Sequence, residues 1–124
     1  MSSKFGLRIA LGLALAAVLA ACSGGASTPP SGAAVNLSAL DTFKYDPNTI
    51  QAKVGQPVHV VLANKGVLVH SFVIDEVNFK ISNVAGGASG DGTFTPTQAG
   101  TYVFYCEQPG HKAGGMTGTL VVTQ

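Results

Sequence analysis

One stretch near the end of the chain most constrains what this sequence can fold into. It places a thiol, an imidazole and a thioether at Cys106, His111 and Met116, with the spacing Cys-x4-His-x4-Met. Runs typical of β-strands lead into it at 100–105 and out of it at 117–123, while the proline and glycines between them exclude a regular element. The stretch is therefore predicted to be a loop that turns several side chains toward one point.

These side chains are soft or borderline metal ligands. A copper site with two imidazoles, one thiolate and a long, weak thioether bond needs such groups, and the loop supplies three of the four. The second imidazole is predicted to be His70, which opens the strand-like run 71–74 and can face the same end of a sandwich as the loop. His59 lies inside the run 58–62 and is interpreted as a partly exposed or hydrogen-bonded strand side chain.

Short apolar runs separated by turn residues follow one another from residue 35 onward. The predicted strands are 35–40, 50–54, 58–63, 72–77, 80–84, 93–95, 100–105 and 117–123. Residues 86–92, which are rich in glycine, are predicted to be a flexible loop. No long stretch has the 3.6-residue apolar period of a helix. About seven or eight short strands predict an all-β fold, a Greek-key antiparallel β-sandwich.

The first residues have the features of a secretory signal. Lys4 and Arg8 precede a short apolar run at 9–19, and small residues follow it. The run is shorter than the roughly 20 apolar residues of a membrane span. Residues 1–21 are therefore predicted to be a signal peptide of the lipoprotein type.

The end of this segment, Leu19-Ala20-Ala21-Cys22, resembles the bacterial lipobox. Cys22 is therefore predicted to be lipidated and to become the new N-terminus; a plain signal peptide cut elsewhere, or a short retained anchor, is the alternative. Residues 22–34 carry no charge and are rich in Ser, Gly and Pro, which is typical of a flexible linker. Residues 35–124 then form one small domain.

The two cysteines and the charge balance narrow the function. Two cysteines in an exported protein usually indicate a disulfide. If Cys22 carries lipid, however, Cys106 has no partner and would be oxidised unless something such as a metal occupies it. Two of the seven basic residues lie in the signal segment, so the remainder is near neutral. This argues against nucleic acid, which needs a basic patch.

Taken together, these segments resemble the cupredoxins, the small type 1 (blue) copper proteins. The matching pieces, which together cover 35–124, are Tyr45–Ile50, Val54–Val58, Asn64–Ile74, Ala99–Cys106, Pro109–His111 and Met116. The Cys-x4-His-x4-Met loop is longer than the plastocyanin loop and is more similar to that of auracyanin. Ser71 departs from many cupredoxins, in which asparagine follows the first histidine and supports a hydrogen bond toward the loop cysteine. A serine hydroxyl can partly replace that bond.

The resemblance implies one copper, cycling between Cu(I) and Cu(II). His70 and His111 would bind it through imidazole nitrogens, Cys106 would bind as thiolate in the same trigonal plane, and Met116 would be the axial ligand. The implied function is to shuttle single electrons between membrane or periplasmic redox partners, such as a cytochrome or a membrane electron-transfer complex, without catalysis.

The resemblance also implies how such a protein works in its surroundings. We expect a monomer that is exported and lipid-anchored to the periplasmic or extracellular face of a bacterial membrane. The edge of the His111 ring is expected to reach the surface within an apolar rim of Val67, Leu68, Pro109 and Ala113. Such a patch suits brief docking of a redox partner.

Other classes remain open at this point. A copper-storage or chaperone lipoprotein would bind Cu(I) and release it readily. A two-copper oxidase domain needs a second cysteine in the loop, and a copper nitrite reductase needs further histidines, whereas only His59 is spare. A thiol enzyme built on Cys106 and His111 would need a third group to orient the pair, and none is evident.

Overall fold

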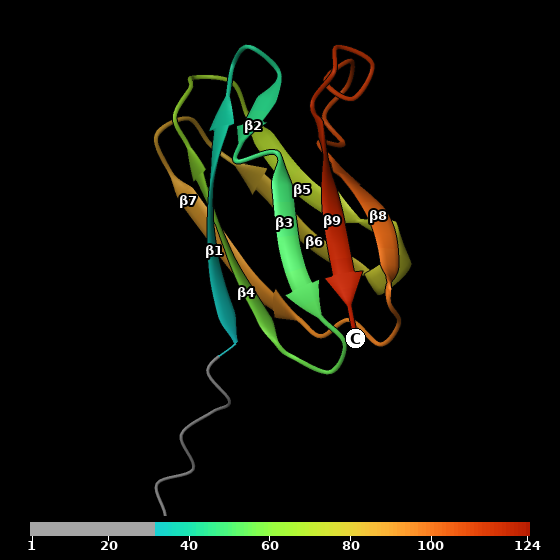
Figure 1. Ribbon diagram of the computed structural model, residues 1–124. Helices are drawn as coiled ribbons and strands as arrows, with labels where there is room; N and C mark the ends of the chain where they lie inside the picture. The colour runs from blue at the N-terminus through green and yellow to red at the C-terminus, as the bar shows by residue number, and fades with distance from the viewer. Residues whose placement is uncertain (1–31) are drawn as a thin grey trace, which may run out of the picture.

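The computed structural model describes residues 32–124, which form two β-sheets packed face to face (Figure 1). One sheet has the strand order β2-β1-β4-β7 and the other β3-β9-β8-β5-β6. In chain order the elements are β1 (Ala33–Leu40), β2 (Lys44–Asp46), β3 (Thr49–Lys53), β4 (Val58–Asn64), β5 (His70–Ile74), the 3-10 turn η1 (Asp75–Val77), β6 (Phe79–Val84), β7 (Ser89–Phe94), β8 (Gly100–Tyr105) and β9 (Thr117–Thr123). The prediction of an all-β sandwich is confirmed.

The core lies between the sheets and follows the two-residue period of the strands. In β4, Val58, Val60 and Leu62 are fully buried, and the residues between them are more exposed. Phe72 of β5 and Phe104 of β8 pack against each other, with ring centroids 4.8 Å apart. Phe72 lies two positions after His70, and Phe104 lies two positions before Cys106, so the same packed aromatic pair anchors the strand ends that carry both residues.

The sandwich is mixed rather than purely antiparallel. β1 pairs in parallel with β4, and β3 pairs in parallel with β9, while the remaining pairings are antiparallel. Parallel neighbours need a crossover connection. The chain makes one between β1 and β4, because it passes through β3 in the opposite sheet before it returns.

The prediction of a flexible loop over 86–92 is wrong for its second half, because β7 begins at Ser89. Gly90 and Gly92 face β6 so closely that a Cβ at Gly90 would lie 2.7 Å from Ile81 Cγ2, and one at Gly92 would lie 2.8 Å from the Phe79 ring. Close packing of β7 against β6 therefore requires glycine at these two positions. The glycine-rich composition of the segment does not indicate a loop there.

Two other strands also differ from the prediction: one has different boundaries and one was not predicted. The strand predicted at 72–77 begins earlier, at His70, and ends at Ile74, where η1 follows with Asn78 in a left-handed conformation after it. The three-residue strand β2 lies between the predicted strands 35–40 and 50–54 and was not predicted.

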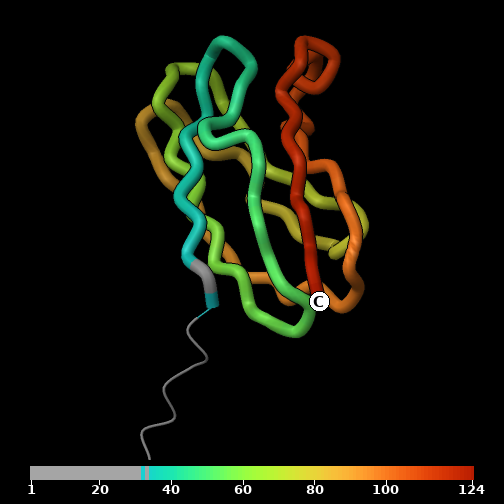
Figure 2. The backbone as a smooth tube through the Cα atoms, viewed as in Figure 1, coloured from blue at the N-terminus to red at the C-terminus, as the bar shows by residue number. Residues whose placement is uncertain are grey.

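Three connections meet at one end of the sandwich: those between β1 and β2, between β4 and β5, and between β8 and β9. Figures 1 and 2 show them together at the top, with the C-terminus at the opposite end. Residues 1–31, which include the predicted signal peptide and Cys22, lie outside the described residues. Within residues 32–124 no helix is long and apolar enough to cross a membrane.

Candidate metal centre

The structure brings His70, Cys106 and His111 together at this end of the sandwich. His70 is the first residue of β5, Cys106 directly follows β8, and His111 lies in the loop before β9. One ligand atom from each residue lies within 4.8 Å of the other two. Cys106 Sγ is 3.4 Å from His111 Nδ1. Cys106 and His70 are fully buried, and only 9% of His111 is exposed.

The two ring nitrogens of His70 have different surroundings. Nε2 lies 3.1 Å from Asp41 Oδ1. Nδ1 is buried and has no hydrogen-bond partner within the described residues. Buried polar atoms are almost always paired, and a metal ion in the cluster would satisfy this one. Two imidazole nitrogens and one thiolate are a donor set that suits copper.

Met116 completes the loop from the other side. The Cys106 N–H donates to the Met116 carbonyl (3.1 Å), and the Met116 N–H donates to the His111 carbonyl (2.9 Å). Gly115, just before Met116, has φ +102°, which a side chain would strain. These contacts hold the fully buried Met116 beside Cys106 in the core cluster.

Ser71 is the residue that approaches the cysteine sulfur. Its backbone N–H lies 3.4 Å from Cys106 Sγ, and its hydroxyl oxygen lies 3.6 Å from the same atom. Because this oxygen also accepts the Glu107 N–H (2.9 Å), its own hydrogen is free to point to the sulfur. The Ser71 carbonyl accepts the Tyr45 hydroxyl at 2.5 Å, and burial raises the pKa of Tyr45, which keeps it a neutral donor.

Aromatic neighbours shield His111. The Phe43 and His111 ring centroids are 4.6 Å apart, and those of His70 and His111 are 5.0 Å apart. Gly114 leaves room for Phe43, because a Cβ there would lie 2.5 Å from the Phe43 ring. Burial is the main cause that lowers the pKa of His111, and the neighbouring His70 ring lowers it further. The neutral imidazole is the form that binds metals.

Sequence reasoning missed two residues that build this end of the molecule, Asp41 and Phe43, and gave no role to Asn64, although Asn64 begins one of the segments that resemble the cupredoxins. Asp41 and Phe43 lie in the connection after β1, which reaches the same end as the ligand loop. Their only sequence signal is that position, and it becomes useful once the strands are placed. The interpretation of His59 as a strand side chain is confirmed, because it is partly exposed in β4 and lies 2.9 Å from Asp91 Oδ2.

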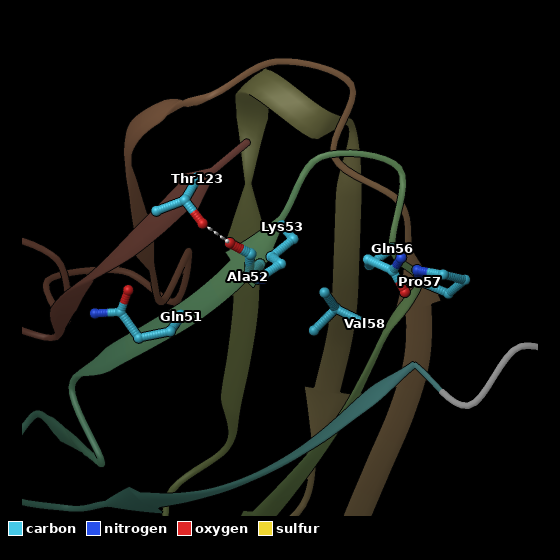
Figure 3. A pocket seen from close by; sticks show the side chains of 7 residues that line it. All are labelled: Gln51, Ala52, Lys53, Gln56, Pro57, Val58 and Thr123. Atoms are coloured by element: carbon cyan, nitrogen blue, oxygen red, sulfur yellow. Dashed lines mark hydrogen bonds between the residues drawn. The ribbon is translucent and has the colours of Figure 1, made fainter.

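Apolar side chains are exposed beside the cluster. The exposed fractions of Val67, Leu68 and Val69 are 85%, 42% and 41%. Pro109 and Ala113 of the ligand loop are also exposed, as the predicted rim requires. Another surface hollow, formed mainly by β3 and the β3–β4 turn, is lined by no His, Cys, Met, Asp or Glu and so offers none of the usual metal-ligating side chains (Figure 3).

A family model described as a cupredoxin-like domain matches residues 11–122. The chain belongs to this cupredoxin-like family. In this cupredoxin, His70, Cys106, His111 and Met116 have the arrangement of a type 1 copper site for one copper ion.

Two curated relatives and one solved structure give the context of this cupredoxin. It is 34% identical over 101 residues to the copper-resistant cuproprotein CopI of Rubrivivax gelatinosus, covering 66% of this chain and 61% of the relative. It is 26% identical over 96 residues to sulfocyanin of Sulfolobus acidocaldarius, covering 76% and 48%. The chain thus spans about half to three fifths of these relatives. Auracyanin of Roseiflexus castenholzii has a similar structure, with a TM-score of 0.68 and 26% identity over 75% of this chain and 100% of auracyanin.

Proposed function

We propose that this cupredoxin carries single electrons, with His70, His111 and Cys106 as the equatorial copper ligands and Met116 as the axial one. The observation that carries the proposal is the burial of the cluster: three of these side chains are fully buried and His111 is 9% exposed. A site closed in this way leaves no position for a substrate. Ligands fixed by a packed sandwich also limit the rearrangement when a bound copper changes its oxidation state.

The path for the electron follows from the same geometry. His111 is the most exposed of the four residues, and the rim of Val67, Leu68, Pro109 and Ala113 lies in the two loops of this end. A small surface with exposed apolar side chains suits a transient contact of the redox-partner kind. The proposed partners are redox proteins, such as a cytochrome or a membrane electron-transfer complex, and the proposed carrier is a monomer without enzymatic activity.

A second candidate function is copper binding for storage or delivery. It is favoured by the 34% identity to a protein named as a copper-resistant cuproprotein. A storage or delivery protein must release its metal to a competing ligand. The burial of Cys106 and Met116 opposes ready release, and for this reason electron transfer is the preferred proposal.

The test uses the full chain loaded with Cu(II). We expect an intense blue or green colour from charge transfer between thiolate and copper, which ascorbate bleaches and an oxidant restores. The reduced protein should keep its copper when it is mixed with a Cu(I) chelator. Colourless protein at full copper occupancy, or rapid transfer to the chelator, would favour storage. Cys106→Ser should lose the colour, whereas His59→Ala should keep it.

We also propose that the protein is exported and held at the membrane by lipid on Cys22. The support is the lipobox-like sequence and the uncharged linker that follows it. Mass spectrometry of the native N-terminal peptide tests this directly. An unmodified N-terminus at a residue beyond Cys22 would refute lipid anchoring without affecting the proposal for the copper site.

A further inference from the structure

The carboxylate of Asp41, in the connection between β1 and β2, holds both His70 and the loop before it. Its Oδ1 lies 3.1 Å from His70 Nε2 and accepts a hydrogen bond from the Leu68 N–H (3.2 Å), and its Oδ2 accepts one from the Val67 N–H (2.8 Å). Both carboxylate oxygens of Asp41 therefore serve as acceptors for backbone N–H groups. An ionised carboxylate only accepts hydrogen bonds.

The tautomer of His70 follows from that contact. If Asp41 can only accept, Nε2 of a neutral His70 must carry the proton, and Nδ1 must present its lone pair. Nδ1 is the buried atom without a partner, and it belongs to the group of atoms that could hold the metal. Asp41 therefore fixes which nitrogen is available to copper.

The backbone next to this carboxylate is shaped to receive it. A Cβ at Gly66 would overlap the Asp41 carboxylate, so only glycine allows the approach. On the other side of the loop, the buried Asn64 accepts the Gly66 N–H (2.9 Å) and donates to the carbonyls of Leu68 (2.6 Å) and Val84 (2.8 Å). Asn64 secures the loop from inside, so the contact of Asp41 with His70 is not needed merely to keep the loop in place.

We propose that Asp41 is a positioning residue that directs His70 Nδ1 toward copper and, through its negative charge, lowers the reduction potential of the site. Carboxylates that accept from a metal-bound histidine orient the ring and raise its basicity. A negative charge nearby also favours Cu(II) over Cu(I), because its attraction grows with the charge of the ion. The inference rests on His70 being a copper ligand, as proposed above, but not on any redox partner.

The chain offers a matched control in Asp91. Its carboxylate lies 2.9 Å from His59 Nε2, a pair much like that of Asp41 with His70, but the His59 side chain is 44% exposed and that of Asp91 is 66% exposed. Asp91→Asn removes the same charge and the same kind of contact from a histidine outside the copper cluster. Asp41→Asn keeps the size of the side chain but removes its charge. An amide has one oxygen, so it cannot accept hydrogen bonds at both of the positions that the carboxylate oxygens occupy.

Redox titrations of the full-length copper protein compare the parent, Asp41→Asn and Asp91→Asn. Loss of a partner of a metal ligand typically costs 10–100-fold in metal affinity. We expect Asp41→Asn to lose affinity for Cu(II) about tenfold more than for Cu(I), which raises the potential by about 59 mV for a one-electron couple. Asp91→Asn should leave the potential unchanged. Equal potentials in the parent and both variants would overturn the proposal.

Two further measurements keep the test decisive. Gly66→Ala preserves net charge but displaces the carboxylate, so it should raise the potential too and replaces Asp41→Asn if that variant does not fold. In the parent, nitrogen NMR of the Cu(I) form should show metal on His70 Nδ1 and a slowly exchanging proton on Nε2; metal on Nε2 would refute the proposal. A His70→Ala variant that keeps the parent spectrum would instead refute the copper site itself.

Discussion

The molecule contains two histidine–aspartate pairs. Their nitrogen–oxygen distances are similar, but the two histidines differ in burial. His70 Nε2 lies 3.1 Å from Asp41, and His59 Nε2 lies 2.9 Å from Asp91. The side chain of His70 is fully buried and that of Asp41 is 34% exposed, whereas the exposed fractions of His59 and Asp91 are 44% and 66%. Both histidines belong to strands, so secondary structure does not distinguish them.

The second ring nitrogen makes the difference. His59 alternates with the inward-facing Val58 and Val60 of β4, so its ring points to the surface, where water can satisfy it. His70 begins β5 and faces inward, where Nδ1 finds no partner among the described residues. In this molecule, therefore, only the buried pair leaves a histidine nitrogen without a hydrogen-bond partner among the described residues, and only His70 lies in the group that could hold a metal ion.

The largest expected difference between the two histidines is in the colour of the Cu(II) protein when each one is replaced. His70→Ala should abolish the intense charge-transfer band of the Cu(II) protein, because the copper loses one of its three strong ligands. His59→Ala should keep the band, because that ring lies outside the cluster. Visible absorption of both variants at full copper loading measures this. Identical spectra for the two variants would show that His70 does not bind copper.

A smaller effect is expected at the axial position. Met116→Leu should keep copper and colour, since the two histidines and Cys106 hold most of the metal. It should raise the reduction potential, because the axial donor stabilises Cu(II) relative to Cu(I). Met116→Gln supplies a stronger oxygen donor and should lower it. A redox titration of both variants beside the parent decides this; unchanged potentials with intact copper would mean that Met116 is not a ligand.

The ligand cluster could be predicted because its signals are local. Cys106, His111 and Met116 lie within eleven positions, and His70 opens a strand that continues with Ser71 and three apolar residues. The hydrogen bond between His70 and Asp41 joins residues 29 positions apart, and no spacing rule predicts such a contact.

The strands, too, could be predicted where the signal is local and could not where it depends on long-range contacts. Alternation of apolar residues identifies β3 from sequence, and short runs rich in apolar and β-branched residues identify β4 and β9. The parallel pairings of β1 with β4 and of β3 with β9 depend instead on how the chain crosses between sheets. The glycines of β7 were interpreted as a loop signal. They are in fact required because β6 packs closely against β7, and this tertiary contact cannot be predicted from local strand propensity.

The free energy of unfolding tests how strongly the loop before His70 is held in place. Asn64→Ala removes the side chain that holds the loop before His70. The part-buried Gly66 N–H and Leu68 carbonyl and the buried Val84 carbonyl then lose their hydrogen bonds to it. Buried groups left without partners cost about 1–3 kcal/mol each. Urea unfolding of the metal-free protein should therefore show a loss of at least that order. Asn36→Ala, at an exposed position of β1, is the control; equal losses in the two variants would contradict the role of Asn64.

The smallest effect is expected for the exposed pair. Asp91→Asn should change the free energy of unfolding of the metal-free protein by less than about 1 kcal/mol, because exposed ion pairs gain little in water and must fix two side chains. The pairing energy itself comes from a double-mutant cycle with His59→Gln, measured by urea unfolding at low and at high salt. It should be small at low salt and smaller still at high salt, since salt screens exposed charges. A coupling energy well above 1 kcal/mol that survives high salt would mean that the His59–Asp91 contact is structural, and that burial alone does not separate the two histidines.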